Sequence, residues 1–466
     1  MSSNTQTATQ TPRPGGSSSE SRPFALHARR ASVIVIIAGL AALSLVWIKD
    51  PLIARAVVVA GVCLTLWLSE AVPPFVPTLV LWLMTPLLLQ PLSEEFRLGR
   101  VLGWSAEPVL VLFLGGFALG VAARRHGIDA RLAQIALRLS GGRRLALLAL
   151  TAAATAFLSM WMSNIAAAAM MLSAAHPLLA GMPEGDRFRR ALLLSIAVGA
   201  NFGGIATPIG TGPNAIAIAA ATRHQTITFL DWMAFALPLS LGLIVAGVLL
   251  LALRFRVRGV TALPDLPQRP RSRGASGVLI VFIVTVAAWL TEPLHGASSA
   301  LVALAATAVL FGSGLLERRD LSRLDWSTLM LIAGGIGLGN LLEKSGVVTA
   351  VAAAVPWAHV PDLARVFLLC FASATLSALM SNTATATMLI PLAASLDPAP
   401  STAILIAVAA SLGVPFVIST PPNAMVYGEG GVRSGDFLAP GLALMLLGCL
   451  LISLTGPFVL NLLGIP

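Results

Sequence analysis

The feature that most constrains the fold is a polar segment that occurs twice within apolar surroundings. The first copy, SMWMSNIAAAAMML, covers 159–172, and the second, SALMSNTATATMLI, covers 377–390. A Thr-x-Pro-Asn-Ala turn follows each copy, at 211–215 and 420–424. An unpaired amide or hydroxyl in a dry interior costs about 2–7 kcal/mol. We therefore expect the Ser-Asn pairs to bind something, in a fold built from two related halves.

The apolar content of the chain indicates a polytopic, all-α membrane protein. Hydrophobic residues make up 57% of the chain and charged residues 11%, and the mean hydropathy is +0.87, whereas about a quarter of a soluble domain is charged. Runs long enough to cross about 30 Å of hydrocarbon as helices predict about eleven transmembrane helices. These runs lie near 33–49, 53–69, 76–92, 107–123, 191–221, 232–253, 277–291, 298–316, 327–342, 402–427 and 438–464.

Two further apolar stretches, 145–181 and 362–396, are too long for one crossing. Each is interrupted near its centre, by Ser163-Asn164 or by Ser381-Asn382. Irregular backbone at membrane depth is tolerated where protein or a wet cavity surrounds it. We therefore predict two re-entrant helical hairpins. The alternative is two ordinary helix pairs, each with a polar kink.

The arginines of this chain, whose net charge is +10, indicate its orientation in the membrane. They gather at Arg124, Arg125, Arg131, Arg138, Arg143 and Arg144 before the first hairpin, at Arg187, Arg189 and Arg190 after it, and at Arg254, Arg256, Arg258, Arg269, Arg271 and Arg273 in the loop 254–276. Loops rich in Arg and Lys stay cytoplasmic. We expect a multi-pass protein of the cell (inner) membrane, with its N-terminus inside and its C-terminus outside.

The N-terminal segment and the cysteines bear on the fold as well. Residues 1–30 are rich in Ser, Thr, Gln, Pro and Gly, a composition that buries too little apolar surface to fold, so we expect a disordered cytoplasmic tail. Cys63, Cys370 and Cys449 lie in separate apolar runs and suggest neither a disulfide framework nor a metal motif.

The duplication extends beyond the Ser-Asn segments and is typical of a secondary transporter. The segment 107–129 aligns with 326–348, and Gly115-Gly116 falls on Gly334-Gly335, glycines that we expect to serve close helix packing. After the first glycine pair the connector carries six arginines, whereas its counterpart at 343–365 carries two basic and two acidic residues. Equivalent segments therefore face opposite sides, as in an inverted-topology repeat. The predicted repeats are 107–253 and 326–466.

The polar breaks predict an anion site near the middle of the membrane. TPIGTGPNA at 207–215 and STPPNA at 419–424 interrupt two further helices, because proline cannot continue a helix. Together with the hairpin tips, these breaks bring four half-helix ends together. Helix N-termini carry about half a positive charge and unpaired N–H groups, which favour carboxylate or sulfate. An anion could be held there without arginine.

The same breaks offer neutral oxygens, which sodium prefers, as in other transporters with broken helices. The expected ligands of one sodium site are Ser159, Ser163, Asn164 and the carbonyl near Gly210, and those of the other are Ser377, Asn382, the carbonyl of Met380 and the backbone at Ser419. The alternative is that these Ser and Asn side chains only cap helices. The sequence shows no clear ionisable residue at membrane depth, so we expect sodium rather than proton coupling.

These motifs resemble the divalent anion:sodium symporter family, whose members carry Ser-Asn-Thr at two hairpin tips. Ser381-Asn382-Thr383 matches that motif, TPIGTGPN and STPPNA resemble the paired broken helices, and LWLSEAVP at 66–73 resembles an early family signature. The resemblance covers the chain from residue 33 onward. It implies a homodimer with scaffold helices, at 31–106 and 277–325, and a transport domain that moves as an elevator.

By the same resemblance, a small set of residues would contact the anion. These are Asn164, Thr211, Asn382, Thr383, Thr420 and Pro421, together with Ile165, which stands where the family has threonine. The isoleucine removes one hydroxyl from the pocket and weakens the inference to a symmetric dicarboxylate. A substrate with one less polar end, or sulfate, then becomes more plausible.

We therefore expect a transporter that imports a small divalent anion, first a C4-dicarboxylate, together with sodium ions. A sodium-independent exchanger of the same family is the nearest alternative, and an ion channel with broken helices is a more distant one. We do not expect an enzyme, because no hydrolase motif and no cluster of acids or histidines lies within the apolar runs.

Overall fold

The computed structural model describes residues 47–69, 71–222, 225–263, 272–354, 361–396 and 399–465. Within these ranges the ordered elements are helices, apart from one isolated bridge between Arg143 and Val260, which confirms the all-α expectation. The expected tail at 1–30 and most of the first apolar run at 33–49 lie outside the described residues.

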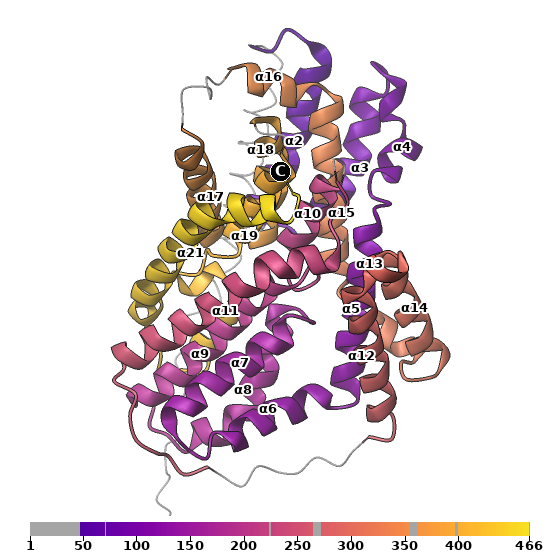
Figure 1. The fold of residues 1–466 in the computed structure, drawn as a ribbon. Helices are drawn as coiled ribbons and strands as arrows, with labels where there is room; N and C mark the ends of the chain where they lie inside the picture. Colours follow the sequence, from indigo (N-terminus) through magenta and orange to yellow (C-terminus); the bar gives the residue numbers. More distant parts are fainter. Residues whose placement is uncertain are drawn as a thin grey trace, which may run out of the picture.

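Helices outside the repeated segments pack at two places, at the top of the molecule and along its right side in the view of Figure 1. At the top, α2 (Pro51–Ser69) and α3 (Val76–Leu89) pack against α15 (Trp326–Lys344), with η1 (Glu94–Phe96) and α4 (Leu98–Gly103) after α3. Along the side, α12 (Ala275–Leu290) and α14 (Ser299–Gly312) pack against α5 (Pro108–Arg125). The short α13 (Glu292–His295) joins α12 to α14, and η3 (Arg318–Arg323) precedes α15. Arg125 at the end of α5 is ion-paired with Glu317 and Asp320, which fastens α5 to η3.

The two repeated halves contain the same succession of elements. The first runs from α5 through α6 (Ile128–Leu139), α7 (Arg144–Ser159), α8 (Asn164–Ala180), α9 (Arg187–Gly203), η2 (Gly204–Ala206) and α10 (Gly212–Ala221) to α11 (Phe229–Arg254). The second runs from α15 through α16 (Val347–Ala354), α17 (Asp362–Leu379), α18 (Asn382–Leu396), α19 (Pro400–Ala410), η5 (Val417–Ser419) and α20 (Pro421–Gly428) to α21 (Ser434–Leu462). The helix breaks fall at the two Ser-Asn pairs and at the two proline-rich segments. The path of the hairpins through a membrane stays a prediction.

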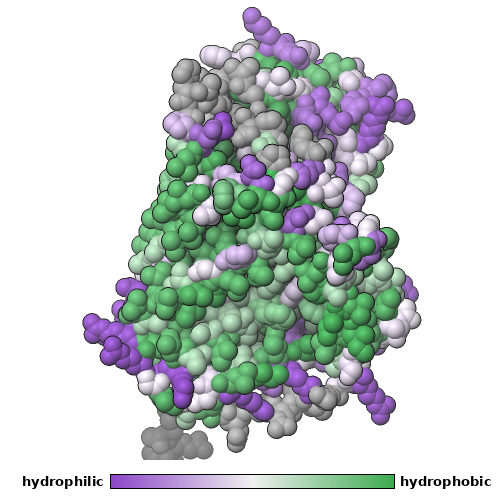
Figure 2. Space-filling model, viewed as in Figure 1, coloured by the Kyte–Doolittle hydropathy of each residue, from purple (hydrophilic) through white to green (hydrophobic). Residues whose placement is uncertain are grey.

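The described helices have the apolar character of a membrane protein. Four of them, α5, α11, α17 and α21, are long and apolar enough to cross a bilayer, and several shorter apolar helices accompany them. The face shown in Figure 2 is largely apolar, with hydrophilic patches along its lower margin and at its upper right. The apolar runs 191–221 and 402–427 each divide into two helices, so the number of complete crossings stays a prediction.

Glycine allows the closest helix contact in the first half, between α7 and α9. A Cβ added at Gly203 would lie 2.5 Å from both the Cα and the carbonyl oxygen of Ala156. The paired glycines are also packing positions, as expected: Gly115 lies against Ala303, and Gly334 lies against Thr78 and Trp67. Small residues thus set the helix spacing around the site.

Candidate functional site

The two hairpin tips have the same hydrogen bonds. Ser163 Oγ accepts from the backbone N–H of Ala166 at 3.3 Å, and Ser381 Oγ accepts from that of Ala384 at 3.1 Å, so each serine caps the helix after it. The asparagines do not share this role, although the sequence suggested that both residues of the pair could cap. The Oδ1 atom of each asparagine instead accepts a hydrogen bond from a buried serine at the end of the preceding helix.

Each asparagine at a tip is held by the serine five residues before it. Ser159 Oγ donates to Asn164 Oδ1 at 2.7 Å, and Ser377 Oγ donates to Asn382 Oδ1 at 2.8 Å. Ser159 Oγ also lies 2.7 Å from the carbonyl oxygen of Ala200 in α9. Both serines are fully buried. The arrangement fixes the orientation of each amide and, behind the first tip, brings Ser159 Oγ, Asn164 Oδ1 and the Ala200 carbonyl oxygen together.

The broken helices are fastened to the hairpins in matching ways. Thr207 Oγ1 donates to the carbonyl of Met160, and Ser419 Oγ donates to the carbonyl of Ala378 at 2.8 Å. In each case the acceptor is the residue after the hairpin serine. The repeated fastening shows that the duplication extends to individual side chains.

The asparagines of the Pro-Asn-Ala turns hold the breaks themselves together. Asn214 Nδ2 donates to the carbonyl of Thr207 at 2.8 Å, and Asn423 Nδ2 donates to the carbonyl of Phe416 at 2.9 Å. These carbonyls lie at the breaks, where each also accepts one backbone N–H, from Gly210 at 3.3 Å and from Ser419 at 3.2 Å. Both asparagines are buried and have a structural role.

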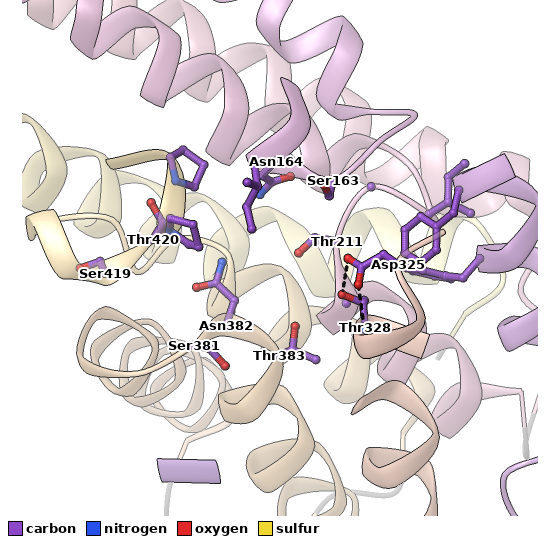
Figure 3. A pocket seen from close by; sticks show the side chains of 18 residues that line it. Ser163, Asn164, Thr211, Asp325, Thr328, Ser381, Asn382, Thr383, Ser419 and Thr420 are labelled. Carbon is purple, nitrogen blue, oxygen red and sulfur yellow. Dashed lines mark hydrogen bonds between the residues drawn. The ribbon is translucent and has the colours of Figure 1, made fainter. Parts of the chain in front are cut away.

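The hairpin tips and the broken helices surround a cavity of about 170 Å³. All seven residues that we expected to contact the anion line it: Asn164, Ile165, Thr211, Asn382, Thr383, Thr420 and Pro421. Asn164 and Asn382 approach it from opposite sides (Figure 3). The two halves touch here, because a Cβ added at Gly212 would lie 2.4 Å from Thr383 Oγ1. None of the described residues that line the cavity is Lys or Arg.

The expected sodium ligands lie partly on the cavity wall and partly behind it. Ser163, Asn164, Gly210, Asn382 and Ser419 line the cavity, whereas Ser159, Ser377 and Met380 do not. Behind the first tip, oxygens converge on Asn164. A Cβ added at Gly204 would lie 2.5 Å from Asn164 Oδ1 and 3.0 Å from the Gly210 carbonyl oxygen. Behind the second tip, the Ser377–Asn382 hydrogen bond is the corresponding contact. Cation binding at either place stays a prediction.

The sequence interpretation missed one ionisable residue on the cavity wall, Asp325. Its carboxylate caps α15, accepting from Thr328 N at 3.0 Å and from Thr328 Oγ1 at 2.7 Å (Figure 3). Both residues line the cavity, as do Phe113 and Phe117 of α5. The available signal was an Asp just before the second Gly-Gly helix, where a helix start is favoured. The expectation that the interior offers few ionisable groups therefore needs this exception.

Comparison with known proteins supports the fold and the class of protein. Residues 43–403 match the model of the family described as CitMHS, citrate transporter. The sodium-dependent dicarboxylate transporter SdcS of Staphylococcus aureus is 26% identical, over 85% of this chain and 84% of that protein. The inorganic phosphate transporter PHO87 of Saccharomyces cerevisiae is 28% identical over 90% of this chain, which spans about half of that protein, 47% of its length.

Among solved structures, the YdaH transporter of Alcanivorax borkumensis has a similar fold. The TM-score is 0.59 and the sequence identity 16%, over 84% of this chain and 98% of that one. At this identity the likeness concerns the fold alone.

Proposed function

The chain belongs to the CitMHS (citrate transporter) family, and we propose that it is a sodium-coupled symporter of a small divalent anion. The family confirms the expected relation to dicarboxylate transporters. A C4-dicarboxylate is the first choice of substrate and sulfate the second. Import of the dianion with two or more sodium ions would draw on the sodium gradient. Any net positive charge carried inward would add about 2.3 kcal/mol per 100 mV of membrane potential.

The observation that carries this proposal is the composition of the cavity wall. The starts of α8, α10, α18 and α20 contribute Asn164, Gly212, Asn382 and Pro421 to one small cavity. Helix N-termini present unpaired N–H groups and partial positive charge. The start of α20 contributes only the partial charge, because Pro421 and Pro422 have no N–H and Thr420 caps that of Asn423. These helix N-termini can bind an anion without fixing a full positive charge in the protein, which favours release as well as binding.

Sodium coupling is supported by the oxygens behind the tips. Because Ser159 Oγ donates its hydrogen, its lone pairs stay available, as does the second lone pair of Asn164 Oδ1. The Ala200 and Gly210 carbonyls lie beside them. Since Asn164 also faces the cavity, a cation there would fix the side chain that contacts the anion. This shared residue offers a physical basis for coupling.

The choice of anion depends on the two unequal sides of the cavity. Thr383 supplies a hydroxyl on one side, whereas Ile165, 49% exposed, supplies a methyl group on the other. The relatives named above include a dicarboxylate and a phosphate transporter. A sodium-independent exchanger remains the alternative. The elevator movement, the homodimer, the inverted repeat and the cytoplasmic N-terminus belong to the proposal.

Uptake into proteoliposomes tests the proposal. Radiolabelled succinate is measured with and without an inward sodium gradient, and sulfate, citrate, malate and inorganic phosphate are added as competitors. Accumulation that requires the sodium gradient supports symport. Uptake that ignores sodium but requires a preloaded anion would replace symport by exchange.

A pair of asparagine variants tests the site. Asn382→Ala removes a cavity-lining amide but leaves the Ser381 cap in place, so we expect a folded protein whose uptake falls about 100-fold. Asn340→Ala is the matched control, because Asn340 hydrogen-bonds within α15 and does not line the cavity. Uptake by Asn382→Ala equal to that of the control would remove Asn382 from the site.

A further inference from the structure

Two adjoining cavities lie away from the substrate site, where the end of α5, the start of α6 and the start of α12 meet. The larger is about 580 Å³ and is lined by basic and polar residues: Arg124, Arg125, His126, Arg131, Gln134, Ser272 and Ser276. The smaller is about 260 Å³ and has an apolar wall that includes Leu132, Phe157, Trp161, Val278 and Phe282. The two adjoin, because Ile128 and Leu279 line both.

We propose that this pair of cavities binds one anionic phospholipid, with the headgroup phosphate in the basic cavity and part of an acyl chain in the apolar one. A free inorganic anion would satisfy only the first cavity and a neutral hydrocarbon only the second. An amphiphile with one phosphate and long chains matches both and their connection.

The basic cavity has positive charge to offer a phosphate. Arg125 is ion-paired with Glu317 and Asp320, but Arg124 and Arg131 form no ion pair within the described part of the chain. The carboxylates of Asp129 and Asp325 attract Arg124 electrostatically, and neither lines this cavity. No Asp or Glu occurs among the described residues that line this cavity. Guanidinium groups bind phosphate oxygens in paired hydrogen bonds, and the hydroxyls of Ser272 and Ser276 add donors.

His126 holds one wall of this cavity in place. Its Nε2 lies 2.9 Å from the carbonyl oxygen of Leu315, and its Nδ1 lies 2.8 Å from Ser272 Oγ. Since a carbonyl only accepts, Nε2 carries the hydrogen. The imidazole therefore joins Leu315, between α14 and η3, to Ser272, just before α12. This contact keeps Ser272 beside the arginines.

The apolar cavity is open to hydrocarbon at its edge. Phe157 and Leu279 line it and remain 45% and 46% exposed. Asp129 is the one charged residue among its described lining, and its side chain is buried. Acyl-chain burial there is favourable because it fills a dry, apolar space with matching atoms.

The location suits a lipid of the cytoplasmic leaflet. The arginine-rich segments at this end are expected to face the cytoplasm, and anionic lipids concentrate in that leaflet. Basic pockets between transmembrane helices on the cytoplasmic side bind anionic headgroups. The charge of the cavity thus matches the lipid that its position makes available.

A bound lipid would touch the first hairpin near its tip. Phe157 and Trp161 flank Ser159, and the Trp161 ring lies 5.2 Å from that of Phe282 in α12. An acyl chain in this space would join the hairpin to α12. If the transport proposal holds, removing the lipid alters the uptake rate. Lipid binding itself can be measured without transport.

Native mass spectrometry of the purified, delipidated protein tests the proposal. Palmitoyl-oleoyl phosphatidylglycerol is added, with the phosphatidylcholine of the same chains as the zwitterionic comparison. We expect one phosphatidylglycerol per chain, bound about tenfold more tightly than phosphatidylcholine. Arg124→Gln/Arg131→Gln should lower that affinity about tenfold, whereas Arg187→Gln, an exposed arginine that does not line the cavity, should leave it unchanged.

Two further arms separate the lipid from a free anion. Ala123→Phe fills the apolar cavity and should weaken phosphatidylglycerol binding without changing any binding of inorganic phosphate. Millimolar inorganic phosphate should not displace the lipid. Should the double arginine variant fail to fold, Arg131→Gln alone serves, since its side chain is half-buried. Equal binding of both lipids, or an unchanged affinity in the arginine and Ala123→Phe variants, overturns the proposal.

Discussion

Asp325 places a carboxylate on the wall of a cavity proposed to bind an anion. Asparagine caps helices as well as aspartate, and its amide can still hydrogen-bond Thr328. Asp325→Asn should therefore preserve the fold and remove only the negative charge. We expect the KM for a dianion to fall about threefold to tenfold, because a nearby like charge raises the free energy of the bound anion. Concentration-dependent uptake measures this change. Loss of sodium-dependent uptake would instead make Asp325 a ligand of the coupling ion.

Ile165 determines how far the two sides of the cavity differ. Ile165→Thr adds a hydroxyl on the side opposite Thr383, and a net hydrogen bond contributes about 1 kcal/mol. We expect the preference for succinate over sulfate to rise about fivefold, with expression unchanged, because Ile165 is 49% exposed. Competition of the two anions against labelled succinate measures the preference. Ile418→Thr is a matched control, because Ile418 is exposed and does not line the cavity. An unchanged preference for succinate over sulfate would show that Ile165 does not contact the anion.

The elements themselves follow from the sequence more closely than the roles of their polar residues. The breaks at Ser163-Asn164 and Ser381-Asn382 could be predicted, because polar residues interrupt an apolar run at those points. The different hydrogen bonds of the serine and the asparagine in each pair could not be predicted. The serine at the cap position reaches the N–H three residues ahead, whereas the asparagine at the first helical position meets a serine of the preceding helix. That partner depends on the angle between the two helices.

Close contact between α7 and α9 holds the first hairpin against the first broken helix. Gly203→Ala would place a Cβ 2.5 Å from the Ala156 backbone, which cannot give way without separating the helices. We expect a loss of about 1–3 kcal/mol in stability and a large loss of uptake. Gly242→Ala in α11 is the control, because no atom lies within 4 Å of the added Cβ, so it should be neutral or slightly stabilising. Thermal unfolding in detergent compares the two variants, and equal melting temperatures would contradict the packing argument.

At the scale of the molecule, the sequence could predict two related halves but not everything that they enclose. The seven expected anion contacts line one cavity because they belong to the repeated motifs. Phe113, Phe117 and Asp325 line it as well, and they come from α5 and α15, whose motifs indicated only packing. The position of these three residues at the cavity depends on how α5 and α15 pack beside the hairpins. This is a tertiary relation that no local pattern records.

Although α5 belongs to the first repeat, it packs against the scaffold helices α12 and α14. If α5 stays with them, the proposed elevator movement requires contacts between α5 and the first broken helix to separate. The built Cβ of Gly116 lies 3.2 Å from the Cβ of Ile209, close to the separation of about 3.5–4.5 Å in a disulfide. Gly116→Cys/Ile209→Cys should therefore cross-link under oxidation, abolish uptake, and recover it on reduction. Each single-cysteine variant under the same oxidant is the control, and mass spectrometry counts the free thiols. A cross-linked protein that still accumulates substrate would show that α5 and the broken helix move together, and an elevator movement of the broken helix past α5 would be excluded.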